Sequence, residues 1–320
     1  MLKEGVRGLL WEDQDMFTSP LSPTDHAVLS AVRDGWLPVA ESAAYLPVGF
    51  GAHHWRIDQD GVPALFATLD MPGGHRTPDL FERAYAAASE LAARGFLGVL
   101  APVRSTNGSF TIRLAEGILS VVPWATGRTP DEVEAVRPDH TAKTKRLLAE
   151  LHSAPAPVSL PRWQTRITPD FSGQLTHAAT ELWNTGPFGE DARRLIVDSA
   201  ESIAGWASRY AELAEKALAA LDRWVPTHGE PHHANQILTD SGLVLVDWES
   251  FALAPHERDL FHLPEHDRRA LGGEPEMIEL FELEWRLTEI EQYARWFQAP
   301  HTGSEDDRIA LADLRNELNH

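Results

Sequence analysis

The pattern of apolar and polar positions divides the chain into a strand-rich first part and a helix-rich second part. Short apolar or alternating runs, separated by Gly and Asp turns, predict antiparallel strands in the first part. Residues 45–57 read as a strand, a glycine turn and a second strand, and further strands are predicted at 64–69, 110–114 and 118–124. These segments predict a small antiparallel sheet.

Helical spacing of apolar residues dominates the rest of the chain. Two helices are predicted beside the sheet, at residues 23–36 and 78–94, and Gly95 marks the end of the second. The later helices are predicted at residues 139–152, 172–184, 189–224 and 276–297. A small sheet followed by a mostly helical region is an α+β arrangement.

Residues 227–248 carry the candidate chemistry. Apolar runs at 236–239 and 243–248 flank Asp-Ser-Gly, which predicts a hairpin that brings Asp247 beside Asn235. Glu230 precedes Asn235 by five residues, on a loop that contains Gly229 and Pro231. A carboxylate that orients a hydroxyl, with an amide and a second carboxylate that hold Mg²⁺, is the set that phosphoryl transfer requires.

Two other interpretations of this stretch remain open. His228, Glu230, His232 and His233 could bind zinc, although the chain has no Cys and Pro231 interrupts a helical arrangement. The stretch could also be a surface hairpin without chemistry.

Composition limits the classes of protein and partner. The 320 residues suggest two domains, and 43% hydrophobic with 24% charged residues is typical of a globular protein. The net charge of −20 argues against nucleic acid or an anionic membrane as partner and favours a cationic small molecule. The absence of Cys, of an apolar signal segment and of a long apolar run leads us to expect a cytoplasmic protein.

The stretch His228-Gly229-Glu230, followed by Asn235 and Asp247, resembles the catalytic loop and metal-binding Asp of the aminoglycoside phosphotransferase family, small-molecule relatives of the protein kinases. The family loop has Asp where this chain has Glu230, whose extra methylene extends the carboxylate by about 1.5 Å. The resemblance implies a bilobal protein-kinase-like fold, with a nucleotide-binding lobe at residues 1–126 and a catalytic and substrate-binding lobe at 127–320.

The resemblance also implies a role for each catalytic residue. Glu230 is expected to act as the base or to orient the acceptor hydroxyl, while Asn235 and Asp247 hold Mg²⁺. His228 completes the catalytic set by shaping the loop, and Asp259 is expected to brace it.

The nucleotide, ATP or GTP, is expected against the sheet. Gly49 and Gly51 would cover its phosphates, and the backbone near Val122 and Trp124 resembles the hinge that binds the base. The family's third-strand Lys is replaced by Thr68.

No Lys lies between Lys3 and Lys143, so Arg56, Arg113 or the metal would have to compensate for the missing charge. The expected activity is O-phosphorylation of an aminoglycoside or aminocyclitol antibiotic. The alternatives are a metabolic kinase for a sugar, amino alcohol or nucleoside, and a nucleotide-binding protein with little transferase activity.

Overall fold

The structure is a computed structural model that describes residues 20, 22–48, 52–71 and 77–319. These residues form two compact units, one containing the described residues up to Trp163 with Asp222–Glu274, the other containing Gln164–Leu221 with the described residues from Pro275 onward. The lobe boundary expected at residue 126 stays a prediction.

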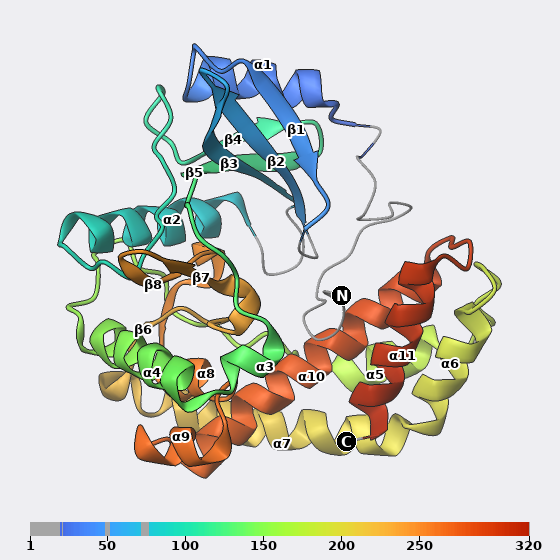
Figure 1. The fold of residues 1–320 in the computed structure, drawn as a ribbon. Coiled ribbons are helices and arrows are strands. Elements are labelled where there is room, and N and C mark those ends of the chain that lie inside the picture. Colours follow the sequence, from blue (N-terminus) through green and yellow to red (C-terminus); the bar gives the residue numbers. More distant parts are fainter. Residues whose placement is uncertain (1–19, 21, 49–51, 72–76, 320) are drawn as a thin grey trace. The chain divides into compact units, whose positions relative to one another are not determined.

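A five-stranded antiparallel sheet opens the first unit, as the sequence predicted (Figure 1). Its order is β1-β2-β3-β5-β4. The strands are β1 (Ser42–Leu46), β2 (Ala52–Gln59), β3 (Val62–Asp70), β4 (Thr111–Leu114) and β5 (Gly117–Pro123). The predicted glycine turn at Gly49 and Gly51 lies outside the described residues.

The sheet is covered by a helix on each face (Figure 1). Helix α1 (Asp25–Gly35), capped by the Thr24 side chain, packs on the face that carries Trp55 and Ala67. Helix α2 (Pro78–Ala93) packs Phe81 and Tyr85 near Ile118, whose side chain belongs to the opposite face because side chains alternate along a strand.

The rest of the first unit contains residues 227–248 and is built mostly from short helices and strands (Figure 1). They are α3 (Glu132–Ala135), α4 (Pro138–Ser153), β6 (Val225–Thr227), β7 (Gln236–Thr239), β8 (Gly242–Leu245), β9 (Ala252–Ala254), α8 (Glu257–Leu260) and α9 (Glu265–Ala270). The hairpin β7–β8 confirms the prediction, but its second strand ends at Leu245 instead of residue 248. Asp247 has φ 64° and ψ 68°, a left-handed conformation that cannot continue a strand.

The second unit is helical. It contains α5 (Phe171–Ala178), α6 (Gly189–Asp198), α7 (Ala200–Leu218), α10 (Pro275–Gln298) and α11 (Glu305–Asn319). The single helix predicted over 189–224 is wrong, because Ser199 leaves helical geometry and ends α6 before α7 begins. The helix predicted over 172–184 stops at Ala178, and α11 was not predicted.

None of the helices in the described ranges combines the length and the apolar character needed to cross a membrane. The α+β class, with an antiparallel sheet followed by a helical region, is confirmed.

Candidate active site

The loop that leaves β6 turns sharply at Gly229. This residue has φ 102°, and a Cβ there would lie 2.5 Å from Cζ of the buried Arg258. Arg258 in turn donates hydrogen bonds from Nη1 to Thr227 Oγ1 (3.1 Å) and to the Ser250 carbonyl (2.9 Å). Glycine is therefore required both by the backbone conformation and by the space that the guanidinium fills.

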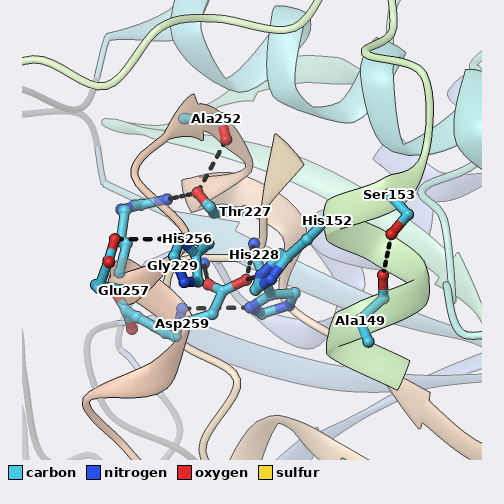
Figure 2. Close-up of polar contacts among 12 residues, drawn as sticks. Ala149, His152, Ser153, Thr227, His228, Gly229, Ala252, His256, Glu257 and Asp259 are labelled. Atoms are coloured by element: carbon cyan, nitrogen blue, oxygen red, sulfur yellow. Dashed lines mark hydrogen bonds and ion pairs between the residues drawn. The ribbon is translucent and has the colours of Figure 1, made fainter. Parts of the chain in front are cut away.

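Asp259, in the single turn of α8, braces this loop (Figure 2). Its fully buried carboxylate accepts hydrogen bonds from the His228 amide (3.0 Å), the Gly229 amide (2.6 Å) and His152 Nε2 (2.9 Å). Burial alone would raise the pKa of Asp259, but the hydrogen bond and charge of His152, with the loop amide, hold it below its ordinary value. The bracing role predicted for Asp259 is confirmed.

His152 belongs to the same brace. Sequence analysis gave His152 no part in the site, yet its imidazole, near the end of α4, reaches across to Asp259 (Figure 2). In the sequence, only the Leu-His pair near the end of the predicted helix pointed to His152. Its partner Asp259 lies 107 residues further along the chain. Only the fold brings the two together.

His228 links the loop to the segment that carries Asp247. Its Nε2 donates to the Val246 carbonyl (2.9 Å), its Nδ1 accepts from the Glu230 amide (3.3 Å), and its ring meets Trp248 edge-on at 4.7 Å. Burial lowers the pKa of His228, which keeps the imidazole neutral and able to both donate and accept. These contacts fit the loop-shaping role that was predicted for His228.

The structure brings Glu230, Asn235 and the Asp247 segment together. Asn235 Nδ2 donates to the Glu230 carbonyl (3.0 Å), and the Asn235 carbonyl accepts from the Val246 amide (3.0 Å). Ser250 Oγ donates to Glu230 Oε1 at 3.4 Å, so the longer carboxylate is supported by the turn that follows Asp247.

The side-chain oxygen atoms of Asn235 and Asp247 are suitable ligands for Mg²⁺. With its Nδ2 committed to the loop, Asn235 can offer a cation its amide oxygen, and Asp247 supplies a carboxylate. Mg²⁺ takes such hard oxygen ligands in small number and completes its shell with water and phosphate oxygens. Across the described parts of the chain, no three His, Asp or Glu side chains are grouped as a complete metal site, which leaves the zinc cluster without a geometric basis.

Further carboxylates lie near Asp247 that the sequence reasoning did not assign. The Tyr85 hydroxyl donates to Asp70 Oδ2 at 3.5 Å. Burial, followed by the charges of Asp70, Glu249 and Asp247, raises the pKa of Tyr85 well above its ordinary value. In the sequence, Glu249 could have been found from its position two residues after Asp247.

The remaining predicted nucleotide residues lie on β3 and β5. Thr68 pairs with His54 on one side and Ser120 on the other, and Val122 pairs with Phe66. Trp124 follows β5 directly; its amide donates to the Ala64 carbonyl (2.9 Å), and its ring centroid lies 6.3 Å from that of Phe66.

Neither of the two arginines considered as substitutes for the missing Lys stands opposite Thr68, because Arg56 pairs with Phe66 and Arg113 with Ile118. Arg56 Nε lies 2.9 Å from Asp58 Oδ1, in an ion pair on β2. Arg113 is exposed on β4, at the edge of the sheet.

A cavity of about 240 Å³ adjoins the catalytic loop. His232, His233 and His262 line it together with Glu132 and Gln236. Burial lowers the pKa of His232 to about 4 and that of His262 to about 3. Near neutral pH these two imidazoles are therefore uncharged and can hydrogen-bond to hydroxyl groups.

Known proteins share both the sequence pattern and the fold. Residues 44–279 match the phosphotransferase enzyme family. Protein StrN of Streptomyces griseus is 30% identical over 241 residues, covering 71% of this chain and 73% of that protein. Spectinomycin phosphotransferase, solved with ADP and spectinomycin, has a TM-score of 0.68 at 13% identity and covers 92% of this chain and 94% of its own. An ethanolamine kinase of Plasmodium vivax has a TM-score of 0.58 at 11% identity, over 89% and 82% of the two chains.

The structural likeness at these identities establishes the kinase-like fold, and the sequence matches establish the family. The chain belongs to the phosphotransferase enzyme family and is a small-molecule phosphotransferase.

Proposed function

We propose that the protein transfers the γ-phosphoryl group of ATP or GTP, with Mg²⁺, to a hydroxyl of an aminoglycoside or aminocyclitol. The acceptor oxygen forms a bond to the γ-phosphorus while the bond to the β-phosphate oxygen breaks, and the nucleoside diphosphate leaves. Glu230 takes or orients the hydroxyl proton. The observation that carries the proposal is the braced loop, which holds Glu230 and Asn235 beside the Asp247 segment.

Asn235 and Asp247 would hold the magnesium ion, which neutralises charge on the phosphates. The protein's own contribution is positioning. Asp259 fixes the loop amides and His228 ties the loop to the strand before Asp247, so the groups are ordered before the substrates bind. The nucleotide would lie against Thr68, Val122 and Trp124.

The acceptor class rests on charge and on the relatives. The chain carries a net charge of −20, and the similar structures include phosphotransferases named for spectinomycin and ethanolamine. Part of the acidic surface of α10 is already used, because Glu279 pairs with Arg209 and Glu276 pairs with Lys216. A cationic acceptor would therefore be recognised by other carboxylates than these two.

A metabolic kinase for an amino alcohol is the second candidate. The fold similarity to ethanolamine kinase favours it, as does a TM-score of 0.55 with a microcompartment-associated aminopropanol kinase.

The test is a screen of ATP and GTP consumption with Mg²⁺ against aminoglycosides, aminocyclitols, sugars and amino alcohols, with the phosphorylated product identified by mass spectrometry. We expect a product from an aminocyclitol or aminoglycoside. Glu230→Gln is the matched control and should keep nucleotide affinity while slowing transfer by about 10²–10⁴-fold. A product from an amino alcohol alone would favour the second candidate, and nucleotide binding without any product would contradict both.

A further inference from the structure

A polar strip crosses the sheet on the face opposite the α1 core. His54, Thr68 and Ser120 stand side by side in register on β2, β3 and β5, whereas the next register pairs, such as Trp55 and Ala67, are buried in the core of the other face. His54 Nδ1 lies 3.2 Å from Thr68 Oγ1. The strip thus combines an imidazole with two hydroxyl groups.

The strip leads to the segment that we assign to magnesium. Ser120 is hydrogen-bonded to the Tyr85 side chain, and the Tyr85 hydroxyl is close enough to Asp247 and Glu249 for their charges to raise its pKa. Phosphates held through a metal at Asp247 would therefore lie on the same face of the sheet as Thr68 and His54.

Among the residues that the structure describes, neither arginine considered for this role stands opposite Thr68 as His54 does. Arg56, two residues beyond His54 on β2, is paired with Asp58, and the chain has no Lys between Lys3 and Lys143. Arg113 is exposed on the edge strand. His54 is half-buried, so part of the residue remains at the surface.

We propose that His54, oriented by Thr68, binds a phosphate of the nucleotide in the place of the third-strand Lys, and that it takes up a proton from solvent when the nucleotide binds. The proposal rests on the proposed nucleotide-dependent function. In the complex, Nδ1–H donates to Thr68 Oγ1 and Nε2–H donates to a phosphate oxygen, an arrangement that only the imidazolium form allows.

The groups around His54 keep its imidazole neutral in the free protein, so that proton uptake on nucleotide binding can be measured. Burial, with the neighbouring His53, lowers the pKa of His54 to about 4 in the free protein, so the imidazole is neutral near pH 7. The Phe66 ring packs on it at 5.0 Å, Arg56 is paired with Asp58, and Asp70 on β3 is held by Tyr85. A phosphate adds negative charge and raises the pKa of His54, so nucleotide affinity should increase as pH falls from 8 to 6.

The experiment is isothermal titration calorimetry of MgATP binding at pH 6.5, in two buffers with different ionisation enthalpies. His54→Gln should bind about tenfold more weakly, which corresponds to about 1.4 kcal/mol, and should lose the proton uptake seen in the wild type. His54→Lys should restore affinity without proton uptake, because the ammonium is already charged. Arg56→Gln is the matched control on the same strand and should behave as the wild type.

The outcomes separate this inference from the proposed function. Equal affinity or equal proton uptake in His54→Gln and the wild type would overturn the role of His54 while leaving the transferase function intact. If Arg56→Gln lost affinity instead, Arg56 would be the phosphate-binding cation. A wild type that binds neither MgATP nor MgGTP would contradict the proposed function itself.

Discussion

Gly229→Ala tests whether the catalytic loop depends on the space around Arg258. At φ 102° an alanine is strained by about 1–3 kcal/mol. Its Cβ would also lie 2.5 Å from Arg258 Cζ and 2.6 Å from Arg258 Nη1, which is closer than nonbonded atoms approach one another. The buried guanidinium would have to give up one or both of its bonds to Thr227 and Ser250, each worth about 1.5–3 kcal/mol. With one of these bonds lost, we expect a total destabilisation of about 2.5–6 kcal/mol.

Gly242→Ala provides the matched control, because Gly242 has φ 136° and nothing lies within 4 Å of its Cβ position. It carries backbone strain without a clash. Thermal denaturation should therefore show a much larger loss for Gly229→Ala, and turnover should fall by about 10²-fold as the loop carrying Glu230 shifts. Equal losses in the two variants would refute the argument from Arg258, since strain alone would then explain both.

Five further substitutions test the remaining assignments. Asp259→Asn should destabilise the protein by about 3–5 kcal/mol in denaturant unfolding, because it leaves buried N–H donors facing an amide; a loss below 1 kcal/mol would contradict the brace. Asp247→Ala and Asn235→Ala should abolish magnesium-dependent turnover while the protein stays folded, and near-normal turnover would remove the metal assignment. The pKa of about 3 for His262, lowered by burial from 6.5, makes stability fall as pH drops below 6.5; His262→Gln should remove about 2 kcal/mol of the loss between pH 7 and 5, and an unchanged pH profile would count against it. Thr68→Lys should weaken MgATP binding in calorimetry, because it removes the hydroxyl that orients His54 and fills the place of its imidazolium; tighter binding would mean that this place is empty.

The catalytic hairpin could be predicted from sequence because its determinants are local. Asp240 to Gly242 specify the turn, and the short separation of Glu230 and Asn235 fixes which groups share the loop. Asn235 donates to the Glu230 carbonyl because of this spacing, and it accepts from the Val246 amide because of the hairpin. Residue patterns therefore located the candidate site before any fold was known.

Partners distant in sequence could not be predicted in the same way. His152 and Asp259 meet only because α4 and α8 pack near β6, and the pairing of His54 with Thr68 depends on the register of two strands. Helix ends were also missed. The apolar spacing continues across Ser199, so the pattern gives no sign of the backbone change that separates α6 from α7.

The charges around the site explain why the loss of the third-strand Lys matters. Asp70, Glu249 and Asp247 lie close enough to act on the Tyr85 hydroxyl, and His54 is neutral near pH 7 before a ligand binds. Among the described residues, little positive charge offsets the carboxylates that an entering polyphosphate would meet. Its binding would therefore be unfavourable unless cations came with it. Magnesium at Asn235 and Asp247 would provide one source, and protonation of His54 the other. On this argument the site obtains its positive charge together with the nucleotide, where the family's Lys would have supplied it in advance.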